Sequence, residues 1–253
     1  MRTRIVGTTM PVLEIGLAAG EKIVAEPGEM SWMTATIALH TTTATAGARG
    51  LWGAVKRAAG GGGLFMTEFS AEGGDGAVAF AAKLPGAIMQ MEVSPGHGLM
   101  VHRHGFLCAT PGVELGIGFQ KSLGAGIFGG NGLVMQKLTG TCSAWVELGG
   151  EVVTYDLAPG EVLRVHPGHV GMFEESVNFD VTTIPGIANA LFGGDGLFVA
   201  RLTGPGKVWL QTLTVPNLAH ALGPYISREA APAAAAQGGV AGAVLGSLFG
   251  GQR

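Results

Sequence analysis

The sequence has few charged residues, and this scarcity limits the functions open to it. Asp, Glu, Lys and Arg make up 13% of its 253 residues, whereas soluble domains average about 25%. The formal net charge is −3, and the longest basic run is the pair Lys56-Arg57. Because nucleic-acid binding needs a concentrated basic surface, we expect no nucleic-acid partner. A surface with so few charges is expected to be buried between subunits instead.

Cysteines and long apolar runs are also scarce. Cys108 and Cys142 are the two cysteines, and they stand far apart without CxxC spacing, which disfavours a disulfide framework or a zinc finger. No apolar stretch reaches the roughly 20 residues that span a bilayer, and the N-terminal segment lacks the continuous apolar core of a signal peptide. We therefore expect a cytoplasmic protein, with peripheral membrane contact as a second expectation.

Glycine, in contrast, is abundant at 45 residues, and it marks an internal repeat. A Gly-rich phrase occurs three times, as in "GGNGLVMQKLTGT" from residue 129. The leucines of its three copies are Leu64, Leu133 and Leu197. A Pro-Gly phrase recurs at nearly the same spacing, and it begins at Pro27, Pro95 and Pro159. Two markers that keep step over such distances indicate an internal duplication.

The repeat predicts the domain organisation. We place approximate repeat starts at residues 60, 129 and 193 within one compact domain, residues 1–228. Residues 1–59 and 193–223 are partial copies that complement each other. The Ala/Gly-rich segment 229–253 is expected to be a C-terminal tail. The alternative is that this segment packs on a partner or on a membrane surface.

Within each copy the apolar residues follow the period of β-strands. In "GLVMQKLT" the side chains of Leu133 and Met135 alternate with those of Val134 and Gln136, and further short runs rich in β-branched and aromatic residues are bounded by Gly, Pro, Asn and Asp. We therefore predict an all-β fold of duplicated antiparallel β-sandwich or jelly-roll-like units. The few short helices are expected at residues 50–60, 121–129, 185–193 and from Asn217 to Gly223.

The one group of residues with the look of a chemical site is the histidine-rich stretch "GHGLMVHRHG". On a strand, His102 and His104 would point to the same face, as metal-binding imidazoles do, and their spacing matches the start of the cupin metal motif. The motif then needs a Glu a few residues later, where this chain has "LCAT" from residue 107. His102 and His104 are therefore kept as weak metal candidates, and the prediction is no metal and no cofactor.

Other catalytic templates are not met. There is no phosphate-binding GxxxxGK[ST] motif, no GxSxG motif, and no recognisable setting for a cysteine nucleophile. We predict no catalytic residues and no enzyme activity.

The ordered combination of these motifs resembles the altered-inheritance-of-mitochondria 24 family. The motifs that carry it include "PGEMSWMTATIALHTT", "GGGGLFMTEFSA", "PGAIMQMEVSPGHGLMVHRHGFLCAT" and "PGEVLRVHPGHVGMFEESVNFDV", and the resemblance covers about residues 4–226. It implies a duplicated β-sandwich similar to the tryptophan RNA-binding attenuator fold, and assembly as a homo-oligomer, with a trimer as one expected form. Family members in mitochondria are linked to inner-membrane organisation and respiratory biogenesis, but no site residue can be carried over.

Three functional hypotheses follow from the sequence. The first is a non-enzymatic structural or interaction protein that forms a homo-oligomeric β-sandwich scaffold and contacts a membrane or protein partner. The second is a cupin-like metal-dependent enzyme that uses His102 and His104. The third is a small-ligand or lipid-binding module with an apolar cavity between its sheets.

Overall fold

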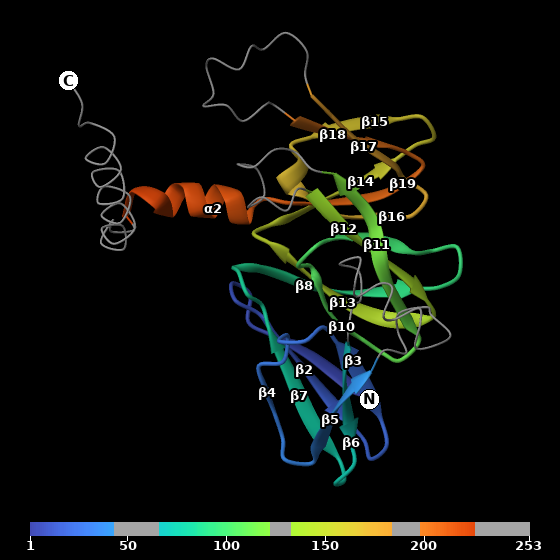
Figure 1. Cartoon of the computed structure of the whole chain (residues 1–253), viewed down its shortest axis with the longest axis vertical. Coiled ribbons are helices and arrows are strands. Elements are labelled where there is room, and N and C mark those ends of the chain that lie inside the picture. Colours follow the sequence, from blue (N-terminus) through green and yellow to red (C-terminus); the bar gives the residue numbers. More distant parts are fainter. Residues whose placement is uncertain (43–65, 122–132, 184–197, 226–253) are drawn as a thin grey trace, which may run out of the picture. The chain divides into compact units, whose positions relative to one another are not determined.

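The computed structural model describes residues 1–42, 66–121, 133–183 and 198–225, and most of these residues lie in strands (Figure 1). The chain divides into two units, Met1–Pro216 and Asn217–Arg253, and the described strands all belong to the first. They are β1 Arg2–Val6, β2 Val12–Leu17, β3 Lys22–Ala25, β4 Trp32–Met33, β5 Ile37–Thr42, β6 Met66–Ala71, β7 Gly76–Ala81, β8 Gly86–Val93, β9 Leu99–His102, β10 Phe106–Ala109, β11 Val113–Lys121, β12 Leu133–Gly140, β13 Cys142–Gly149, β14 Val152–Leu157, β15 Val162–Val165, β16 Val170–Glu174, β17 Asn178–Thr183, β18 Phe198–Thr203 and β19 Gly206–Gln211.

The strands pair antiparallel in four sheets, which we number along the chain. Sheet 1 has the order β1-β2-β7-β4, and sheet 4 has the order β15-β18-β17. Sheets 2 and 3 have six strands each, in the orders β5-β6-β3-β10-β13-β8 and β11-β12-β9-β16-β19-β14. The all-β, antiparallel fold expected from the alternation of apolar residues is therefore confirmed.

The strand orders reveal a threefold internal repeat. When every strand number of sheet 2 is raised by six, the order becomes that of sheet 3. The same operation turns β2-β7-β4 of sheet 1 into β8-β13-β10, which is one half of sheet 2. Sheet 4 matches the other half, because β15-β18-β17 corresponds to β9-β12-β11 of sheet 3. Sheets 1 and 4 are thus complementary halves of one six-stranded pattern, and β1 is an extra strand on sheet 1.

Equivalent turns fix the alignment of the three repeats residue by residue. The turns at residues 18–21, 94–97 and 158–161 each close with a backbone hydrogen bond from the last residue to the first, of 2.9 Å in all three. Each has a glycine in the left-handed region, with φ of 84° at Gly20 and 79° at Gly160, which is the reason glycine is needed there. The sequence alignment of Pro27 with Pro95 and Pro159 was therefore wrong, because Pro27 lies in the next turn, at residues 26–29.

Three cores separate the four sheets. The first lies between sheets 1 and 2, the second between sheets 2 and 3, and the third between sheets 3 and 4. Representative members are Ile15 and Trp145 of the first core, Val101 and Val146 of the second, and Phe173 and Leu202 of the third. Sheets 2 and 3 are therefore covered on both faces, whereas among the described residues sheets 1 and 4 each pack through one face.

Helices are short, as the sequence indicated. Helix α2 spans Val215–Leu222 and a 3-10 turn η4 follows at Gly223–Tyr225, so the helix begins two residues before the expected Asn217. A second 3-10 turn, η3, occupies Pro167–His169. The helices expected at residues 50–60 and 185–193 lie outside the described residues, as do the three predicted repeat starts, the boundary at residue 228 and nearly all of the segment 121–129. No helix in the described part of the chain is long and apolar enough to cross a membrane.

Candidate assembly interface

Sheets 1 and 4 each end in an edge strand whose equivalent in sheets 2 and 3 pairs with a further strand. In sheet 2, β10 pairs with β3, and Cys108 stands opposite Ala25. In sheet 3, β16 pairs with β9, and Met172 stands opposite Val101. The equivalent strands of the remaining repeat positions are β4 and β15, and both stand at the edge of their sheets. Each edge leaves a row of backbone N–H and C=O groups without a ladder partner in the described chain.

The edge strand β4 carries a tryptophan that is far more exposed than its equivalents. Trp32 pairs with Ala79 of β7 in the register in which Cys108 pairs with Trp145 and Met172 with Trp209. Cys108 and Met172 are fully buried, whereas 51% of Trp32 is exposed. A large aromatic ring at a position that is otherwise core indicates a missing neighbour.

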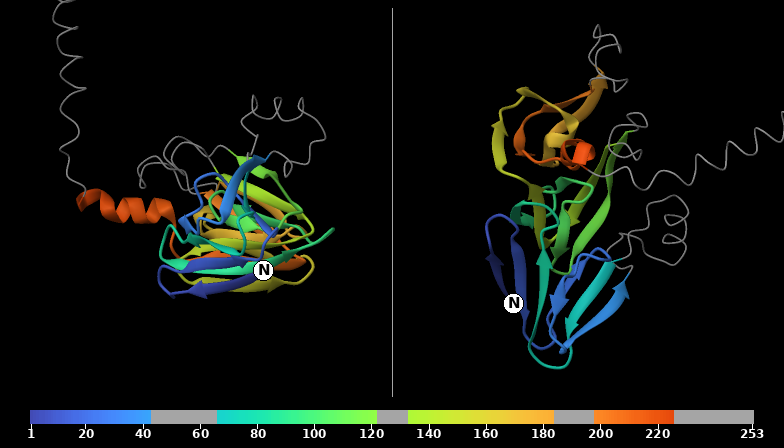
Figure 2. Two further views of the ribbon diagram at one scale, coloured as in Figure 1. Left: turned by 90° about the horizontal axis from the view of Figure 1, so that it is seen from below. Right: turned by 90° about the vertical axis from the view of Figure 1, so that its left-hand side faces the viewer.

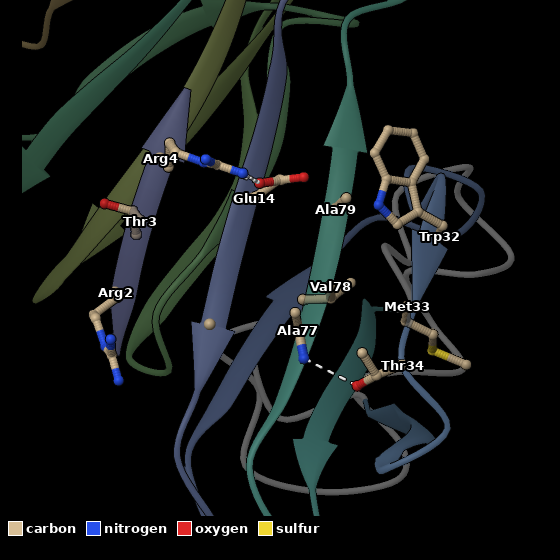
Figure 3. Close-up of a pocket in the computed structure, with 11 residues that line it drawn as sticks. Arg2, Thr3, Arg4, Glu14, Trp32, Met33, Thr34, Ala77, Val78 and Ala79 are labelled. Carbon is tan, nitrogen blue, oxygen red and sulfur yellow. Dashed lines mark hydrogen bonds and ion pairs between the residues drawn. The ribbon is translucent and has the colours of Figure 1, made fainter. Parts of the chain in front are cut away.

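A groove opens beside Trp32 on the outer face of sheet 1, the face away from the first core. Its volume is about 580 Å³. The residues at its floor are small, and Figure 3 shows Ala77 and Ala79 between Trp32 on one side and Arg2 and Arg4 on the other. Arg4 is ion-paired to Glu14 at 2.5 Å on the neighbouring strand, so this wall of the groove is held in place.

The corresponding face on sheet 3 also exposes apolar side chains. On β2, Leu13 and Ile15 point into the first core and are fully buried. Their equivalents on β14 are Val153 and Tyr155, which are 41% and 42% exposed. Val162 of β15 is 40% exposed as well. Val153 and Tyr155 therefore leave an apolar face of sheet 3 exposed, whereas the equivalent residues on β2 are covered by sheet 2.

The predicted histidine pair does not form a shared strand face. Strand β9 ends at His102, and Arg103 and His104 lie in the turn that follows. The imidazole Nε2 of His102 lies 3.2 Å from the Glu147 backbone oxygen, which fits an Nε2–H donor on a neutral ring. Burial lowers the pKa of His102 to about 4, and it lowers the pKa of His104 as well. His102 is thus a neutral group that ties the turn to β13.

The repeat supports a structural role for this turn. Its equivalents are the turns at residues 26–29 and 166–169, each closed by the same backbone hydrogen bond. In the last of them, Nδ1 of His169 lies 2.8 Å from the backbone oxygen of Gln211, the residue equivalent to Glu147. In residues 1–42, 66–121, 133–183 and 198–225, no three His, Cys, Asp or Glu side chains are arranged to hold a metal ion.

A cluster of charged groups near His102 was missed in the sequence, because its members come from separate segments. Glu29 and Lys83 form an ion pair of 2.5 Å, and the Lys83 backbone N–H donates to Glu147 at 3.0 Å. Burial raises the pKa of Glu147 and of the nearby Glu26. This effect is larger than the lowering of each pKa by nearby hydrogen-bond donors. The two buried carboxylates are therefore costly to ionise.

The cysteines are unsuited to nucleophilic chemistry. Both are buried free thiols. Burial raises the pKa of Cys142 to about 11 and raises that of Cys108 as well, so little thiolate is present at neutral pH.

Comparison with known proteins agrees with this architecture. Residues 3–213 match the family described as mitochondrial biogenesis AIM24. The chain belongs to the AIM24 family. Membership confirms the resemblance seen in the ordered motifs, and it covers the repeat region from β1 to the end of β19.

Two matches from Streptococcus pyogenes are similar to this chain over most of its length. A protein of Streptococcus pyogenes serotype M6, described as uncharacterized, is 25% identical over 222 residues, which are 85% of this chain and 87% of that protein. A crystal structure of a Streptococcus pyogenes protein has a TM-score of 0.69 at 23% identity and covers 89% of this chain and 99% of that one. The second match shows that the AIM24 chain shares its fold with a solved structure.

Proposed function

We propose that this AIM24-family protein is a structural, non-catalytic protein that assembles with copies of itself head to tail. Sheet 4 of one copy and sheet 1 of the next form one continuous sheet in the order β17-β18-β15-β4-β7-β2-β1. The observation that carries the proposal is the strand order: the two half-sheets are the missing halves of the pattern that sheets 2 and 3 complete.

The two halves cannot join within one chain. Sheet 1 lies at one end of the unit Met1–Pro216 and sheet 4 at the other, as both Figure 1 and the right-hand view of Figure 2 show. Sheets 2 and 3 with their cores lie between them. The edge of β4 therefore needs the β15 edge of a second copy.

The repeat predicts the register of this junction. Met172 faces Val101 and Phe173 faces Met100 in sheet 3. Val165 is the equivalent of Val101, because each lies four residues after the end of its equivalent turn. Trp32 of one copy is therefore expected opposite Val165 of the next, and Met33 opposite Arg164.

Such a contact is heterologous, since two different edges meet. A heterologous contact forms a closed ring when its rotation closes and an open filament when it does not. We propose a closed ring, for which the trimer implied by the family resemblance is the first stoichiometry to test. The 13% content of charged residues supports burial of surface between copies.

Disulfide trapping tests the register directly. In a background in which Cys108 and Cys142 are replaced by alanine, Met33→Cys and Arg164→Cys are made in separate chains, and the chains are mixed under mild oxidation. Directly opposed strand residues have Cα atoms about 4.5 to 5.5 Å apart, within the range that a disulfide bridges. The expected product is a covalent dimer.

The matched control replaces Arg164→Cys by Val162→Cys, which lies on the same strand outside the predicted pair. A dimer that forms equally with both partners, or with neither while the assembled protein is present, would overturn the proposal.

A further inference from the structure

We infer that the groove on the outer face of sheet 1 is the receptor for Tyr155 and Val153 of the adjoining copy. This inference rests on the proposed head-to-tail assembly and identifies the side chains that carry it. When β4 of one copy joins β15 of its neighbour, sheet 3 of the neighbour packs on the outer face of sheet 1. This contact is equivalent to the packing of sheet 1 on sheet 2 within one chain.

Equivalent side chains on one strand face differ in their exposure. Ile15 of β2 is fully buried in the first core. Its equivalent on β8, Met91, packs against the second core. The third equivalent is Tyr155 of β14, of which 42% is exposed. In the first two repeats the next sheet of the same chain covers this position. The apolar face in the third repeat is therefore expected to be covered by a sheet of the adjoining copy.

The side chains that face this position also differ in size between the repeats. The sheet that covers Ile15 presents Trp145, and the sheet that covers Met91 presents Trp209. The third equivalent of these tryptophans is Ala79 on the floor of the groove. In two repeats an aliphatic side chain faces an aromatic ring. In the third, Tyr155 supplies the aromatic ring and Ala79 supplies the small aliphatic side chain.

This exchange explains the groove. Ala77 and Gly16 extend the floor beside Ala79, and together the three leave space that the ring of Tyr155 can fill. Close packing of such a ring removes a void that would otherwise cost contact energy. The guanidinium group of Arg2 on the wall of the groove supplies N–H donors for the tyrosine hydroxyl, which needs a partner once it is buried.

The experiment compares the dissociation constant of the assembly for single and double variants, measured by sedimentation and native mass spectrometry. Tyr155→Ala is expected to weaken assembly at least about 30-fold, which corresponds to about 2 kcal/mol. Because the Tyr155 side chain is exposed in the single chain, its loss should leave the melting temperature of the isolated subunit unchanged.

Filling the groove from the other side gives an independent test. A Cβ at Gly16 would lie 3.8 Å from the Arg2 backbone oxygen, an ordinary contact, so Gly16→Ala is the matched control and should assemble normally. Gly16→Leu extends into the groove and should weaken assembly. The combination of Gly16→Leu with Tyr155→Ala should assemble more tightly than Gly16→Leu alone.

Two outcomes separate this inference from the proposal beneath it. If the disulfide between the Met33→Cys and Arg164→Cys chains forms but Tyr155→Ala and Gly16→Leu assemble as well as wild type, the groove inference is wrong and the head-to-tail junction stands. If that disulfide does not form, the junction itself is wrong.

Discussion

Acidification should destabilise the protein through His102, and the structure gives the size and the sign of the effect. The folded-state pKa of His102 is about 4, against 6.5 for an unperturbed imidazole. The pKa is lowered on folding, so the unfolded chain binds the proton more tightly. Stability is therefore complete above pH 6.5 and is lost as the pH falls from 6.5 to about 4. At about 1.36 kcal/mol per pKa unit, the loss from this group amounts to about 3 kcal/mol.

The assay is urea unfolding at fixed protein concentration between pH 7.5 and 4, for wild type and for His102→Gln. Glutamine keeps an N–H donor for the backbone oxygen of Glu147 but does not titrate. The difference in unfolding free energy between the two proteins should shift by about 3 kcal/mol in favour of the variant as the pH falls. His97→Gln is the matched control, because His97 is exposed. Parallel pH profiles for wild type and His102→Gln would refute the burial argument.

Three further predictions concern other parts of the chain. Trp32→Ala should weaken assembly by at least about tenfold in sedimentation experiments, with no loss of the β-sheet circular dichroism spectrum; unchanged assembly would count against a role for the β4 edge. Glu147→Gln should gain stability relative to wild type as the pH rises above 4.5, because burial raises the pKa of Glu147 and its ionisation favours unfolding; urea titrations at pH 4.5 and 7 measure this, and an unchanged difference would refute it. Deletion of residues 229–253 should leave fold and oligomer intact in native mass spectrometry, because the repeat ends before them; loss of soluble protein would show otherwise.

The fold could be predicted where local pattern determines structure. The alternation in residues 133–140 is that of β12, and the Pro-Gly turns at Gly96 and Gly160 need a glycine in the left-handed region. The alignment of Pro27 failed for a physical reason. The turn at residues 18–21 keeps its glycine but lacks the proline, and proline is favourable but not required at that position.

The interface could not be predicted in the same way. Trp32, Cys108 and Met172 occupy equivalent positions, and nothing in their local sequence tells which of them lacks a neighbouring strand. That difference depends on strand order, which is set by contacts between distant segments. His104 illustrates the converse error, because alternation was extended past the end of β9 into a turn.

The most direct test of head-to-tail assembly is amide hydrogen exchange in the assembled protein. Head-to-tail assembly predicts that amides of β4 and β15 exchange as slowly as those of their equivalents β10 and β9, which pair inside sheets 2 and 3. Fast exchange at β4 and β15 in the assembled protein, at the rate of the outer edge strand β5, would show that the copies meet elsewhere.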